Sequence, residues 1–199
     1  MTFDLSAVKN ATLTLVTVAA VTACAAAPVS YYSLSNAQRQ PSSDTKDATR
    51  TLVYLRAVRI PTLMQRPEIV TRSNDTNKVN VLDDTLWAGD INEEVAKQYA
   101  RHLEQSMPGL VAFNAPVVPD AQPDVFYTIQ VDQLDGERGG NVNLRMHWTA
   151  KYPDTNQTEQ GSFQGTEETE DNSVDAYLQA MNVLIARSAK AMSSQLSAY

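Results

Sequence analysis

One stretch of the chain constrains its fold more than any other. From residue 141 to residue 152, apolar and polar side chains alternate without a break. The apolar set is Val142, Leu144, Met146, Trp148, Ala150 and Tyr152, and the polar set is Asn141, Asn143, Arg145, His147, Thr149 and Lys151. Because successive side chains of a strand point to opposite faces of a sheet, the pattern predicts a β-strand with one buried and one solvated face. Such a strand is typical of an antiparallel sheet.

Other strands are expected on both sides of this one. Runs rich in β-branched, aliphatic and aromatic residues lie at residues 51–60, 67–72, 78–82, 110–113 and 125–131, and a weaker run lies at 162–168. Asn, Asp, Pro and Gly residues, which favour turns, lie between several of these runs. The runs therefore supply neighbouring strands for the alternating one.

Two segments instead follow the period of a helix. In residues 90–107 apolar side chains recur every fourth position, and Asp90 followed by Glu93 fits a capping box. A second helix is expected at residues 173–196, where apolar residues again share one helical face. The order of strands, helix, strands and helix predicts an α+β fold, an antiparallel sheet with two long helices packed on one face.

The only cysteine, Cys24, ends an apolar run near the N-terminus. Residues 11–23 contain no charged residue, Pro or Gly. This run is shorter than the roughly 20 apolar residues that cross a bilayer, and its length suits a signal peptide. A lone cysteine forms no internal disulfide, so Cys24 is a core residue, a reactive thiol or an attachment point.

The residues Val21, Thr22, Ala23 and Cys24 resemble the lipobox of bacterial lipoproteins. The resemblance implies that residues 1–23 are a lipoprotein signal peptide. It also implies that the thiol of Cys24 is lipidated, that the chain is cleaved before Cys24, and that the new amino group is then acylated. Several acyl chains hold a protein stably to a membrane, whereas one chain does so only marginally. The alternative is a buried core cysteine in an N-terminal helix.

The segment after Cys24 changes in composition. Residues 24–50 are rich in Ser, Gln, Asp and Thr and indicate a flexible tether, except for the short β-prone patch Tyr31–Leu34. Residues 51–199 are then expected to form a single domain. The formal net charge is −7, and no basic cluster is visible along the sequence. This composition argues against nucleic acid as a partner and against electrostatic docking on anionic lipid.

The sequence offers little for catalysis. Its two histidines, His102 and His147, have no partner at a spacing typical of a metal site, and no phosphate-binding loop or nucleophile motif is found. The acidic residues of segment 167–171 favour a solvated loop before a helix N-terminus, where negative charge is stabilising. We therefore predict no catalytic, metal-binding or cofactor-binding residue, no cofactor and no enzymatic activity.

Three stretches resemble one protein family. They are the sequence YYSL at Tyr31–Leu34, the strand–proline–strand pattern with Arg-Pro at Ile60–Arg72, and Leu-Trp-Ala at Leu86–Ala88. Together with the lipobox they are similar to the ABC-type transport auxiliary lipoproteins, of which the PqiC-like lipoproteins are the model. The family often has Pro and an acidic residue after Trp-Ala, and this chain has Gly89 and Asp90 there.

The resemblance implies an accessory role at the outer membrane. Such lipoproteins face the periplasm and belong to systems that contain an MCE-domain protein and transport lipids between the two membranes. Their role there is to bind the conduit that crosses the periplasm. Two alternatives are an outer-membrane assembly lipoprotein and a lipid- or solute-binding domain, and self-association into a homo-oligomer is left open. Trp87 is then either a core residue or a partner contact, and Arg66 and Glu68 are either partner contacts or solvated strand ends.

Overall fold

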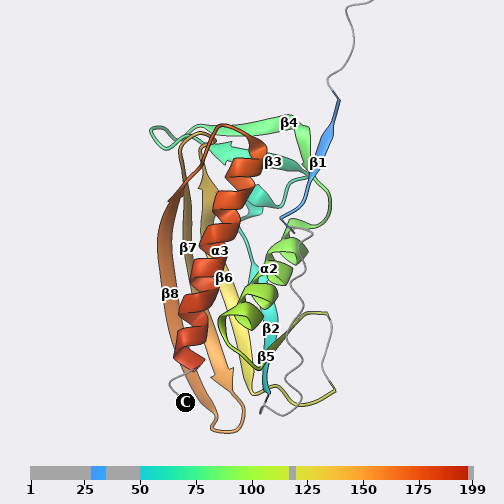
Figure 1. The fold of residues 1–199 in the computed structure, drawn as a ribbon, viewed down its shortest axis with the longest axis vertical. Coiled ribbons are helices and arrows are strands. Elements are labelled where there is room, and N and C mark those ends of the chain that lie inside the picture. Colours follow the sequence, from blue (N-terminus) through green and yellow to red (C-terminus); the bar gives the residue numbers. More distant parts are fainter. Residues whose placement is uncertain (1–27, 35–49, 117–119, 197–199) are drawn as a thin grey trace, which may run out of the picture.

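The computed structural model describes residues 28–34, 50–116 and 120–196 (Figure 1). Cys24 and the predicted signal peptide of residues 1–23 lie outside the described residues. The elements are β1 (Ser30–Tyr32), β2 (Thr51–Arg59), the 3-10 turn η2 (Thr62–Met64), β3 (Glu68–Arg72), β4 (Val79–Trp87), α2 (Ile91–Ser106), β5 (Leu110–Asn114), β6 (Val125–Gly136), β7 (Asn141–Tyr152), β8 (Gln157–Glu168) and α3 (Val174–Leu196).

The strands form two sheets, and the predicted α+β class is confirmed. The larger sheet has the order β5-β2-β6-β7-β8 and the smaller has the order β1-β4-β3. Antiparallel pairing, as predicted, joins β6 to β7, β7 to β8 and β3 to β4. The expectation of a wholly antiparallel sheet needs correction, because β2 runs parallel to both β5 and β6, and β1 runs parallel to β4. The alternation of side chains reports which face of a strand is buried but not the direction of its neighbours.

The alternating stretch is β7, at the centre of the antiparallel part of the large sheet. Its apolar side chains are buried except that of Tyr152, which is partly exposed, and its polar side chains are wholly or partly exposed. Helices α2 and α3 lie side by side over one face of this sheet, as predicted (Figure 1). Between them the hydroxyl of Tyr99 donates to the sulfur of Met146 at 2.9 Å and accepts a hydrogen bond from Ser188 at 3.1 Å. The core therefore lies between the inner face of the sheet and the two helices.

Part of the segment predicted to be a tether belongs to this fold. Residues Ser30–Tyr32 pair with β4, and the side chain of Leu34 is 0% exposed. The backbone oxygen of Leu34 accepts hydrogen bonds from Gln98 of α2 at 3.1 Å and from Asn182 of α3 at 2.9 Å. Residues 30–34 are thus fixed to the sheet and to both helices, while residues 35–49 of the predicted tether lie outside the described residues.

This attachment predicts a stability effect inside the predicted tether. Replacing Leu34 by Ala is expected to lower the free energy of unfolding by about 2–5 kcal/mol, the usual cost of truncating a buried Leu. Tyr31→Ala is the matched control, because the Tyr31 side chain is 67% exposed and lies three residues earlier in the chain. We expect the control to stay within about 0.5 kcal/mol of the wild type in urea unfolding. Equal values for the two variants would contradict the docking of Leu34.

Candidate functional site

The three family-like stretches, far apart in sequence, meet around one end of β4. In the small sheet, Tyr32 of β1 pairs with Trp87 of β4. The backbone N–H of Trp87 donates to the oxygen of Pro67 at 2.8 Å, and the N–H of Ala88 donates to the oxygen of Tyr32 at 2.7 Å. We call Tyr32, Pro67, Trp87 and Ala88 the motif junction. It is held by main-chain hydrogen bonds, so its geometry depends on the backbone of all three stretches.

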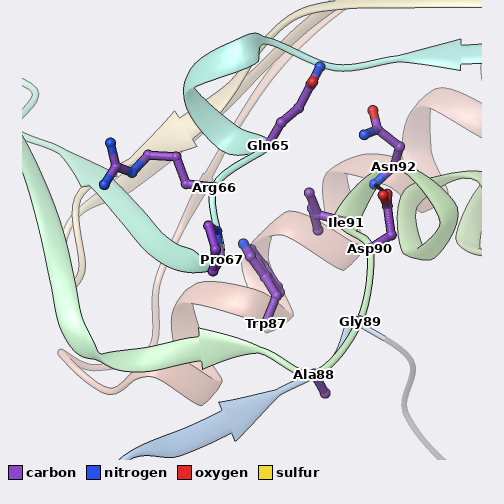
Figure 2. A pocket seen from close by; sticks show the side chains of 9 residues that line it. All are labelled: Gln65, Arg66, Pro67, Trp87, Ala88, Gly89, Asp90, Ile91 and Asn92. Atoms are coloured by element: carbon purple, nitrogen blue, oxygen red, sulfur yellow. Dashed lines mark hydrogen bonds between the residues drawn. The ribbon is translucent and has the colours of Figure 1, made fainter.

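A pocket of about 360 Å³ opens beside the motif junction (Figure 2). Its lining consists of Gln65, Arg66, Pro67, Trp87, Ala88, Gly89, Asp90, Ile91 and Asn92. The indole of Trp87 points from β4 toward Pro67, whereas the side chain of Arg66 extends away from the other lining residues (Figure 2). The pocket therefore combines an aromatic wall with polar and charged groups at its rim.

The wall formed by α2 is fixed by its N-terminal residues. The carboxylate of Asp90 accepts hydrogen bonds from the backbone N–H groups of Asn92 at 2.8 Å and Glu93 at 3.3 Å, which confirms the predicted N-cap. In the same turn, the hydroxyl of Ser33 donates to the carboxylate of Glu94 at 2.6 Å. At Gly89, where the family often has Pro, a Cβ atom would meet nothing within 4 Å. Glycine in place of the family's proline therefore leaves the space beside residue 89 open. The acidic N-cap residue, Asp90, is kept.

The cap supports a prediction for this wall of the pocket. Asp90→Ala is expected to lower the free energy of unfolding by about 1 kcal/mol, because two N–H groups of the helix lose their acceptor. Asp90→Asn is the control, since Asn caps a helix nearly as well and keeps the shape of the side chain. Chemical unfolding of the two variants tests this. A loss as large for Asn as for Ala would mean that charge rather than capping fixes the turn.

The charged groups of this region already have partners. The guanidinium of Arg66 lies 3.2 Å from the carboxylate of Glu68, and both side chains are partly solvated.

Three buried tyrosines, Tyr99, Tyr127 and Tyr177, lie elsewhere in the core, where desolvation raises the pKa of each hydroxyl well above its ordinary value. Such hydroxyls stay protonated and act as hydrogen-bond donors. None of these three tyrosines lines the pocket.

The structure also places the other residues singled out from sequence. His147 lies 3.2 Å from Asp132 on the large sheet, and His102 contacts Gln105 on α2, so the two histidines share no site. Hydrogen bonds from Ser173 hold the pKa of Asp171 below its ordinary value, in the loop that leads into α3. Among the described residues no group of three or more His, Cys, Asp and Glu side chains is placed to hold a metal.

Comparison with known protein families decides the assignment. A family model described as the ABC-type transport auxiliary lipoprotein component matches residues 32–193, which include the motif junction, the large sheet, α2 and all but the last turn of α3. The chain belongs to this family. The sequence-based resemblance is therefore confirmed at the level of the family, and the chain is a transport-auxiliary lipoprotein component.

Solved structures share the fold of this auxiliary lipoprotein. A crystal structure described as an uncharacterized protein is 16% identical, with a TM-score of 0.67, over 85% of this chain and 99% of that one. Protein XCC0632 from Xanthomonas campestris, of family DUF330, is 11% identical, with a TM-score of 0.61, over 83% of this chain and 93% of its own. No curated protein matches the chain.

Sequence reasoning named the residues of the motif junction but did not bring them together. Trp87, left open as core or contact, is 8% exposed and belongs to the core while it also lines the pocket. Arg66 and Glu68 form an ion pair at the start of β3. In the described part of the chain no helix is long and apolar enough to cross a membrane.

Proposed function

We propose that this auxiliary lipoprotein is an outer-membrane-anchored accessory component of an MCE-type intermembrane lipid transport system, in which it docks a periplasmic partner without catalysing a reaction. The family match over residues 32–193 is the observation that carries this proposal. The motif junction supports it, since the three stretches that resemble the family meet there and two of them line the pocket beside it.

The anchor in this proposal is Cys24, after removal of residues 1–23. Only five residues separate Cys24 from Ser30, where β1 begins. A chain of that length spans at most about 20 Å, so the folded domain stays within about one domain diameter of the membrane surface. Confinement to a surface raises the effective concentration of the domain near a conduit that reaches this membrane, so a weak docking contact is sufficient.

The pocket beside the motif junction is proposed as one docking recess. It has an aromatic wall, Trp87, with Asp90 at its rim and the side chain of Arg66 turned outward beside it (Figure 2). Large aromatic residues and Arg are enriched among the residues that contribute most to protein–protein binding. Trp87 then has two roles, because it fills the core on one side and borders the recess on the other.

A genetic test addresses the proposed function. If the auxiliary lipoprotein and the MCE-domain protein act in one system, deleting both genes should weaken the outer-membrane barrier no more than deleting the MCE-domain gene alone. Sensitivity to detergent and to large antibiotics measures this barrier. Additive defects would contradict the proposal. A defect that instead matches the one caused by loss of a β-barrel assembly component would contradict it and favour the assembly alternative.

A further inference from the structure

The face of the large sheet that is turned away from the helices differs from the rest of the protein. We call it the outer face; it carries the outward side chains of β2, β6, β7 and β8. Adjacent strands align these side chains in rows, such as Thr128, Thr149 and Gln160. The outward residues of β8 are exposed throughout the strand. No helix of the described residues covers this face, since α2 and α3 both lie on the other one (Figure 1).

Basic residues gather on the outer face, although they are scattered in the sequence. Arg56 and Arg59 come from β2, Arg145 and Lys151 come from β7, and all of them are exposed. The chain as a whole has a net charge of −7, so the sign of the charge is reversed here. The sequence-level expectation that the chain has no basic cluster holds along the chain but not on the folded surface, because strand pairing brings distant residues together.

The acidic residues of these strands lie outside the rows of Phe126 and Thr128, and Asp124, just before β6, accepts a hydrogen bond from the N–H of Leu52 at 2.7 Å. Asp132 lies 3.2 Å from His147, and Asp135 is paired with Arg72 of β3 at 2.8 Å. Glu168 is the last residue of β8. The rows that contain Phe126 and Thr128 carry no outward carboxylate in the strands that pair there, so the positive charge of Arg56 and Lys151 is concentrated in that part of the face.

Aromatic rings lie next to the basic side chains. Tyr54 of β2 and Phe126 of β6 make an edge-to-face contact with ring centroids 5.9 Å apart. The guanidinium of Arg56 lies 4.6 Å from the centroid of the Phe126 ring, and Lys151 is the cross-strand neighbour of Phe126. A stacked Arg keeps its planar N–H groups oriented, so it loses less freedom when it binds a carboxylate in bidentate fashion.

We propose that the outer face docks an acidic polypeptide segment of a periplasmic partner, with Arg56 and Lys151 as the carboxylate-binding residues. The charge of the face complements such a segment, and Arg beside aromatic rings is typical of the residues that dominate protein–protein binding. The position favours a protein over the anchoring bilayer: the aromatic pair lies beside β5, at the end of the molecule far from β1, where the chain arrives from Cys24 (Figure 1).

This inference deepens the proposed function and rests on it only for the identity of the partner. Photo-crosslinking in the source bacterium tests the two separately. A benzophenone amino acid replaces Thr149, in the middle of the outer face, in the full chain with its anchor. The same amino acid at Gln179, exposed on α3, is the matched control site. The crosslinked peptides are identified by mass spectrometry.

We expect an adduct at position 149 that links this protein to a partner peptide with an excess of Asp and Glu. Combining Arg56→Glu with Lys151→Glu should reduce it about tenfold or more, because two attractive contacts become repulsive. Lys78→Glu with Lys190→Glu, an equal change of net charge at exposed positions elsewhere, should leave it within about twofold. Circular dichroism confirms that each variant is folded.

Three results would overturn the inference: no protein adduct at Thr149, an adduct to lipid, or an adduct that survives charge reversal of Arg56 and Lys151. The partner's identity bears on the proposed function instead. An acidic segment from a protein that lacks an MCE domain would support the inference and contradict the assignment to an MCE-type system.

Discussion

Replacing Trp87 by Ala is expected to lower the free energy of unfolding by about 3–5 kcal/mol, among the largest effects of any single substitution. The indole is 8% exposed and packs in the core, so its removal leaves a cavity that the backbone around it cannot fill. That backbone is fixed, because the N–H of Trp87 donates to the oxygen of Pro67 and Ala88 donates to Tyr32. Urea unfolding of the purified protein measures the change.

Trp87→Phe separates the two roles of this residue. Phe restores most of the buried apolar volume, so we expect it to recover the larger part of the lost stability. If Trp87 also contacts a partner, partner binding by the folded Phe variant should still be weaker than that of the wild type, since large aromatic contacts are sensitive to shape. A loss of less than about 1 kcal/mol for Trp87→Ala would show that the residue is not part of the core.

Replacing Cys24 by Ser is expected to abolish lipid anchoring at the outer membrane completely. The thiol is the only group of its kind in the chain, so no other residue can accept the thioether-linked lipid. Serine keeps the size of the side chain but not this chemistry. The variant should therefore stay as an uncleaved precursor or appear as a soluble form.

Membrane fractionation, detergent phase partitioning and the mass of the purified protein measure this outcome. The wild type should carry the mass of several acyl chains and enter the detergent phase, and the variant should carry no acyl chain and should not reach the outer membrane. Ala23→Gly is a suitable control, because it keeps a small residue before the cysteine. A Cys24→Ser protein that is still acylated and sorted to the outer membrane would contradict the anchor.

Much of the fold could be predicted because the relevant signals are local. The alternation in β7 depends only on the period of a strand, and the cap of α2 depends on Asp90 and the residues that follow it. The parallel pairing of β2 with β5 and β6 could not be predicted in this way, because it is set by crossover connections. Similarly, β4 extends to Trp87 past the exposed Asp83 and Asp84, whose charges obscure the strand pattern.

The candidate sites depend on contacts between distant residues, so less of them could be predicted. The motif stretches were recognised from short sequence patterns, but the pairing of Tyr32 with Trp87 follows from the parallel addition of β1 to β4. The outer face joins Arg56 to Lys151 through Phe126, three residues that only strand register brings together. A count of charges along the sequence cannot reveal such a patch.

The most direct test of the proposed docking role is recovery of partners from detergent-solubilised envelopes. An affinity-tagged full chain is isolated under mild conditions, with Cys24→Ser as the control that lacks the anchor. We expect the wild type to recover an MCE-domain protein and the control, which is not anchored by lipid at the outer membrane, to recover much less of it. Recovery of only a β-barrel protein, or of no MCE-domain protein from envelopes that contain one, would contradict it.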